Sequence, residues 1–196
     1  RSNLDGMTAT AYEDRLRTLS EASTDQHFDA FLDIAWDDPA YAVDQGDERW
    51  ILPPADVLGR HPWYQALPRE EQIRVGLYRQ VNVTKVGLQF EQVLVSGLMY
   101  YAFGLRNGTP EFRYVTHEAT EECHHTQMFQ EFVNRSGVDV AGAPAVFRRL
   151  APILPIPVRA PMAVTSARPW PRTTSVPAWI VDCASSVPAS MPAPVP

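Results

Sequence analysis

The feature that most constrains the fold is a carboxylate in an apolar stretch that is followed, 31 residues later, by a Glu-x-x-His. Glu91 lies in the first stretch, and Glu122 and His125 lie in the second. Both stretches, residues 68–104 and 110–135, lack internal proline and carry apolar residues at helical spacing. In bundles that bind two metal ions, two helices each give a Glu and two others each give a Glu-x-x-His. The pattern therefore predicts the first half of such a site.

Helix geometry predicts that the two carboxylates lie at the same height. A connector of only five residues, 105–109, makes the two helices antiparallel neighbours. Glu91 comes 13 residues before Gly104, and Glu122 comes 12 residues after Pro110. At a rise of about 1.5 Å per residue, both lie roughly 18–20 Å from the connector. Apolar residues continue both faces at helical spacing, namely Gly87, Leu88, Leu94, Val95 and Leu98 around Glu91, and Val115, Phe129 and Phe132 around Glu122 and His125.

Buried acids on these faces favour a bound cation. An unpaired buried carboxylate costs several kcal/mol or holds its proton. A single inward Glu is more often neutralised by Arg or Lys, but no basic residue lies on the matching face here. We therefore predict that Glu91, Glu122 and His125 bind metal. Leu94, Leu98, Tyr101 and Phe129 are candidates both for the wall of an apolar pocket beside them and for ordinary core.

The doubled residues leave a second register open. Glu121 and His124 also form a Glu-x-x-His, and with His117 they share one helix face that could bind a metal through two His and one carboxylate. We favour Glu122 with His125, because their face continues into Phe129. The face of His117, Glu121 and His124 is expected to be exposed to solvent.

Composition excludes several classes of function. The chain has 196 residues, enough for one domain with a sizeable core, and a net charge of −6. No basic cluster indicates nucleic-acid binding, and no apolar run reaches the roughly 18 residues of a membrane span. The first residues lack the layout of a signal peptide, and Cys123 and Cys183 have no zinc-site spacing. A reducing cytoplasm is the expected location.

Three segments resemble the di-iron N-oxygenases typified by p-aminobenzoate N-oxygenase. They are Phe90-Glu91-Gln92, the run from Glu121 to Phe129, and the upstream segment from Asp33 to Pro39, and the likeness covers about residues 10–155. The resemblance implies an all-α, ferritin-like helical bundle with a di-iron centre. It implies Glu91 as a first-helix ligand, Glu122 as a carboxylate able to bridge the metals, and His125 as a terminal nitrogen ligand. It further implies that O2 oxidises the nitrogen of a small aromatic amine, with an unidentified electron donor.

The segments around these helices are less regular. A capping pattern from Thr10 to Glu13 predicts a first helix that ends near Ala22. An apolar cluster follows, made of Phe28, Phe31, Leu32, Ile34 and Trp36. Residues 41–67 are rich in Pro, Asp and Trp and are predicted to form a loop that covers the bundle, with a short helix at 54–58.

The C-terminal part changes character near residue 151. Eleven of the 18 prolines lie in residues 151–196, together with three Arg and a single acidic residue, Asp182. Closely set prolines exclude a helix of bundle length. We therefore predict a partial bundle domain over 1–155 and a Pro-rich tail over 156–196 that is disordered or translated out of frame, the second being favoured. Only the first half of the ligand helices is then present.

Three functions follow from a half site. The first is a di-iron N-oxygenase, inactive if the chain is truncated; a homodimer that joins two half-bundles is an alternative route to a complete site. The second is a ferritin-like bundle that binds or oxidises iron without an organic substrate. The third is a metal-free helical interaction fragment, whose inward acids stay protonated or pair with an Arg.

Overall fold

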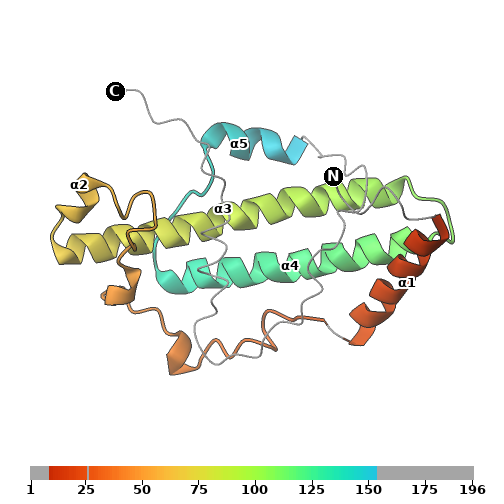
Figure 1. The fold of residues 1–196 in the computed structure, drawn as a ribbon, viewed down its shortest axis with the longest axis horizontal. Coiled ribbons are helices and arrows are strands. Elements are labelled where there is room, and N and C mark those ends of the chain that lie inside the picture. The colour runs from red at the N-terminus through yellow and green to blue at the C-terminus, as the bar shows by residue number, and fades with distance from the viewer. Residues whose placement is uncertain (1–8, 26, 154–196) are drawn as a thin grey trace.

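The computed structural model describes residues 9–25 and 27–153, and this part of the chain is helical and contains no strand (Figure 1). The predicted all-α class is confirmed. The predictions for the tail at 156–196 concern residues outside the described part, and the domain boundary near 155 stays a prediction. The elements are α1 (Ala9–Asp25), η1 (Pro39–Tyr41), η2 (Glu48–Trp50), α2 (Pro62–Gln65), α3 (Arg69–Phe103), α4 (Pro110–Ser136), α5 (Ala145–Leu150) and η3 (Ala151–Ile153).

The long helices α3 and α4 form an antiparallel hairpin, which is the frame of the molecule (Figure 1). Both agree with the predicted stretches to within a residue or two. Glu70 and Glu71 lie in the first turn of α3, where the helix dipole favours acids. The C-terminal end of α4 is followed by Gly137, whose φ of 66° is a left-handed conformation that glycine adopts most readily.

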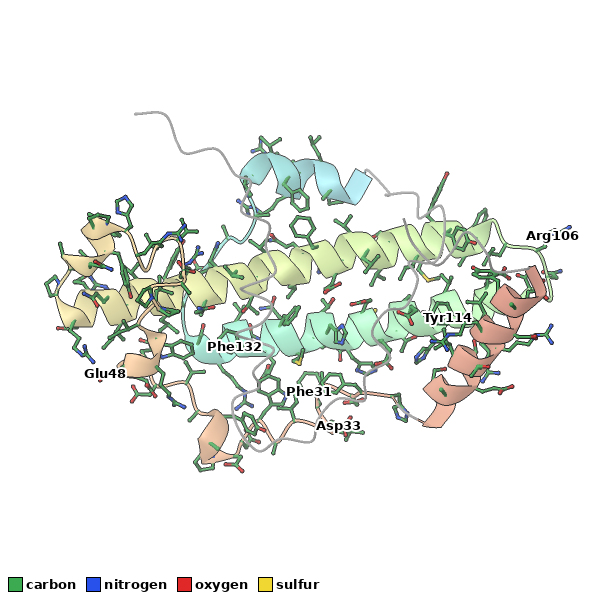
Figure 2. All side chains as sticks on the ribbon, viewed as in Figure 1. Phe31, Asp33, Glu48, Arg106, Tyr114 and Phe132 are labelled. Atoms are coloured by element: carbon green, nitrogen blue, oxygen red, sulfur yellow. The ribbon has the colours of Figure 1, made fainter. Side chains whose placement is uncertain are left out.

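The core forms three clusters along the hairpin. Near the connector, Leu16 of α1 packs against α3 and α4, close to Tyr114 (Figure 2). At the opposite end of α4, Phe132 packs with Leu77 and Val81 of α3 (Figure 2). Between these two, Leu88, Met128 and Phe129 meet residues of the segment after α1. In sequence, Glu91, Glu122 and His125 lie between this middle cluster and the cluster near the connector.

The segment from residue 27 to 67 wraps around the hairpin and is held by polar contacts. The indole nitrogen of Trp36 donates to Ala30 O at 2.6 Å, and Arg135 of α4 donates to Trp36 O at 2.7 Å. The hydroxyl of Tyr64 accepts from Leu52 N and donates to Gln72 O, both at 2.9 Å. Buried polar groups of the covering segment are thereby satisfied.

Several local predictions were wrong in detail. The first helix begins at Ala9, so Thr10 lies inside it rather than at its cap. Residues 54–58 form turns, and the short helix lies at Pro62–Gln65, where the ring Nδ1 of His61 accepts from Trp63 N. The side chains of Phe31 and Leu32 are exposed, whereas Phe28, Ile34 and Trp36 pack against the middle cluster as expected.

Candidate metal centre

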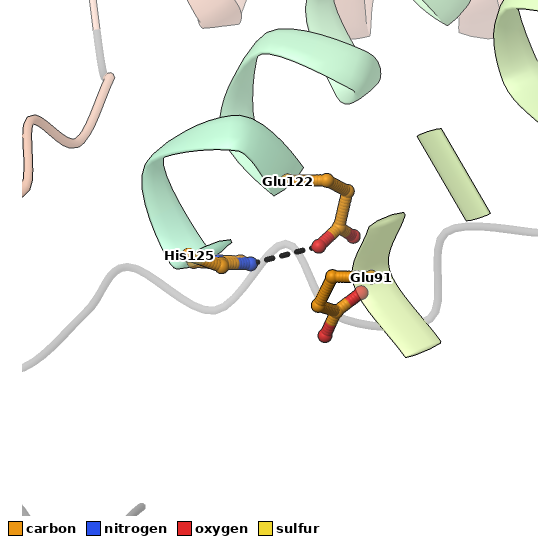
Figure 3. Close-up of side chains that lie close together, drawn as sticks. All are labelled: Glu91, Glu122 and His125. Atoms are coloured by element: carbon orange, nitrogen blue, oxygen red, sulfur yellow. Dashed lines mark hydrogen bonds and ion pairs between the residues drawn. The ribbon is translucent and has the colours of Figure 1, made fainter. Parts of the chain in front are cut away.

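Glu91 on α3 and Glu122 with His125 on α4 come together between the two helices (Figure 3). One ligand atom from each residue lies within 4.8 Å of the other two. The antiparallel arrangement produces this meeting, because Glu91 and Glu122 stand at nearly equal distances from the connector. We call these three residues the trio. All three side chains are partly buried.

Hydrogen bonds link the members of the trio to one another. The ring Nδ1 of His125 donates to Glu122 Oε2 at 2.9 Å (Figure 3). The Glu91 carboxyl group is hydrogen-bonded to Glu122 as well. In the described part of the chain, no Arg or Lys forms an ion pair with Glu91 or Glu122. Among the described residues, His125 is therefore the basic side chain paired with these acids.

Burial and these contacts separate the pKa values of the two acids. Burial raises the pKa of Glu91 to about 7, and the adjacent Glu122 adds to the rise. The pKa of Glu122 is lowered: burial opposes this, but the hydrogen bonds from His125 and Glu91 outweigh it. The pKa of His125 is raised, since the contact with Glu122 outweighs burial. Near neutral pH the trio therefore retains protons that a bound cation would displace.

The alternative residues do not form a comparable cluster. His117 Nε2 lies 3.9 Å from Glu121 Oε1, and His124 Nδ1 lies 4.0 Å from Asp29 Oδ2. Among the described residues, only the trio brings three potential ligand atoms together. The expectation that this face is exposed was wrong, because the side chains of His117, Glu121 and His124 are each only 21% exposed. The covering segment after α1 shields part of it.

Other expected wall residues belong mostly to the core. Leu98 and Phe129 are buried in the clusters on either side of the trio, and Leu94 and Tyr101 pack against the cluster near the connector. Phe28 is a neighbour that sequence analysis did not assign to the site. Its ring centroid lies 6.3 Å from that of His125 and 6.4 Å from that of His124. The apolar cluster in the sequence around Phe28 indicated that its side chain is buried, but not that its ring contacts the two imidazoles.

Within the residues that the structure describes, no helix combines the length and the apolar character that a membrane crossing requires.

Comparison with known proteins gives two kinds of match. The family model of P-aminobenzoate N-oxygenase AurF matches residues 9–164. The uncharacterized protein Rv0885 of Mycobacterium tuberculosis strain H37Rv and the uncharacterized protein Mb0909 of Mycobacterium bovis are each 52% identical to the chain over 164 residues. Each match covers 84% of this chain and 48% of the relative, so the chain spans about half the length of these proteins. No solved structure matches significantly. With a family match over most of its length, the chain belongs to the P-aminobenzoate N-oxygenase AurF family.

Proposed function

We propose that the trio binds iron and that the chain acts as part of a non-haem di-iron oxygenase that uses O2 to oxidise the nitrogen of an aromatic amine. The observation that carries the proposal is the convergence of Glu91, Glu122 and His125 within 4.8 Å, with no Arg or Lys of the described residues paired to either acid. Family membership supports the reaction class.

The donor set fits iron. Carboxylate oxygens and an imidazole nitrogen are ligands that suit Fe(II). The raised pKa of Glu91 indicates that a negative charge on Glu91, beside that of Glu122, is unfavourable without a cation. A divalent ion would remove this penalty, and Glu91, Glu122 and His125 are the residues that would hold it.

The chemistry divides between metal and protein. A bound iron centre supplies the electrons that reduce O2. The protein's residues would hold the metal: Glu91, whose carboxyl group has a pKa of about 7 without a cation, would release its proton on metal uptake. The buried side chains of Leu98 and Phe129, in the clusters on either side, limit the access of water along the hairpin.

Iron analysis tests the metal. The purified chain is reconstituted with Fe(II) without oxygen, desalted and assayed, with Glu122→Gln as the matched control that keeps size and removes charge. We expect stable iron in the wild type and little in the variant. Less than about 0.2 iron per chain in the wild type, with no change in stability, would reject the proposal and leave a metal-free interaction fragment.

Product analysis tests the reaction. The iron-loaded chain receives p-aminobenzoate, a chemical reductant and O2, and the mixture is searched for hydroxylamine and nitro products. We expect product from the wild type and none from Glu122→Gln. Iron oxidation without any organic product would favour the ferritin-like alternative.

A further inference from the structure

We propose that Phe28 is a positioning residue, which fixes the orientation of the His125 imidazole in the metal site. The inference rests on the proposed function, and it adds to the trio a residue from a third segment of the chain. Phe28 lies after α1, about a hundred residues before His125 in sequence.

The ring of Phe28 contacts two neighbouring imidazoles in different ways. Toward His125 the rings are tilted by 40° with centroids 6.3 Å apart, and toward His124 they meet edge to face, at 80° and 6.4 Å. Aromatic rings attract one another at centroid distances of about 4.5–7 Å. Because His124 and His125 are adjacent on α4, one phenyl ring restrains both.

Hydrogen bonds hold the turn that directly follows Phe28. Asp29 Oδ1 accepts from Phe31 N at 2.8 Å and from Leu32 N at 3.0 Å, while Asp29 N donates to Asp33 Oδ2 at 2.8 Å. Ala30, fully buried against the middle cluster, accepts from the indole of Trp36. The backbone that directly follows Phe28 is therefore anchored against the middle cluster.

The contact between Phe28 and His125 would matter most when a metal ion is bound. In the structure His125 is bonded to Glu122 through Nδ1. If His125 and Glu122 both held a cation, this hydrogen bond would no longer restrain the ring. Groups that orient a ligating imidazole change metal affinity by about 10–100-fold when they are removed. Phe28 is placed to give such a restraint through ring contact.

The test uses Co(II), whose visible absorption reports the arrangement of its ligands. Phe28→Leu keeps an apolar side chain and removes the ring. Two controls accompany it: Phe31→Leu changes a phenylalanine of the same turn that is 57% exposed, and Ile34→Ala weakens the same core cluster without removing Phe28. Co(II) titrations and absorption spectra are recorded for all four proteins, together with thermal unfolding.

We expect Phe28→Leu to bind Co(II) about 10-fold more weakly and to shift its absorption bands. Phe31→Leu should match the wild type, and Ile34→Ala should lower the melting temperature but keep the spectrum. A wild-type spectrum and affinity for Phe28→Leu, or the same change in Ile34→Ala, would overturn the positioning role. Absence of Co(II) binding by the wild type would overturn the metal site itself and this inference with it.

Discussion

Glu91 and Glu122 have chemically identical side chains, but their surroundings shift their pKa values in opposite directions. Glu122 accepts hydrogen bonds from His125 and Glu91, so its charge is stabilised. Glu91 is buried beside that charge and has a pKa of about 7. Acids whose pKa values are shifted by burial and a neighbouring charge are frequent in functional sites. Two predictions at this scale follow from the difference.

Exchange of single acids tests the register of the site. Glu122→Ala removes a trio member, so we expect it to lose at least about 10-fold in Fe(II) affinity. Glu121→Ala removes a neighbour that lies beside His117, and it should keep most of the bound iron. Iron content after anaerobic reconstitution measures both. Retention by Glu122→Ala and loss by Glu121→Ala would place the site one residue earlier, on Glu121 and His124.

The pKa of Glu91 predicts how the metal-free stability depends on pH. With a pKa of about 7 when folded and 4.5 as the ordinary value, Glu91 makes the folded chain hold more protons than the unfolded chain between these limits. The contribution of Glu91 to the free energy of unfolding is fully present below pH 4.5 and is lost as pH rises through about 7. The raised pKa of His125 acts in the same direction. Urea unfolding in the presence of a chelator, at pH 5 to 8, measures the effect.

The matched variant is Glu91→Gln, which cannot titrate. We expect the wild type to lose on the order of 2 kcal/mol relative to Glu91→Gln as pH rises from 5 to 8. A constant difference between the two proteins over this range would show that Glu91 ionises normally. With Fe(II) present the trend should reverse, because metal binding releases the protons.

At the scale of elements, the hairpin was predictable and its covering segment was not. Residues 69–103 and 110–136 carry long helical periodicity with Pro near each start and glycine at each end, and these local signals defined both helices. The meeting of Glu91 with Glu122 followed from equal distances to the connector. The position of Phe28 depends on long-range packing by a segment without periodicity, so no local pattern could reveal it. The turn at 54–58 is a different case, because Asp56 accepts from Leu58 N and from Gly59 N, which is a local turn pattern that the helix prediction overlooked.

Gly76 inside α3 and Gly104 directly after it test how closely the covering segment approaches the helix. A Cβ at Gly76 would lie 1.9 Å from the Trp50 carbonyl oxygen, whereas one at Gly104 would have its nearest neighbour at 3.7 Å. We expect Gly76→Ala to destabilise the fold by about 1–3 kcal/mol, because a backbone must move. Gly104→Ala, at a position with ordinary φ, should change stability by less than about 1 kcal/mol. Urea unfolding compares them, and equal stability of the two variants would contradict the close approach.

At the scale of the whole molecule, the number of ligands limits what one chain can do. To the candidate site, the described residues contribute one single Glu, Glu91, and one Glu-x-x-His, Glu122 with His125. A complete di-metal site in a bundle uses two of each. A second copy related by a two-fold axis would supply the same set again. The relatives, of which the matched 164 residues make up 48%, have the length to supply a further set within one chain.

Protein concentration distinguishes a shared site from a single-chain site. If two copies complete the site, Fe(II) binding and association are linked, so apparent iron affinity must rise with protein concentration and the mass must double on loading. If one chain binds iron alone, affinity is independent of concentration and the mass is unchanged. Light scattering with Fe(II) titration at low and high protein concentration measures both, with Glu122→Gln as the control that should stay at one mass. We expect iron affinity to rise with protein concentration and the mass to double, because the three ligands of one chain are too few for two metal ions. Iron bound by a monomer would instead show that one chain uses its three ligands for a single ion.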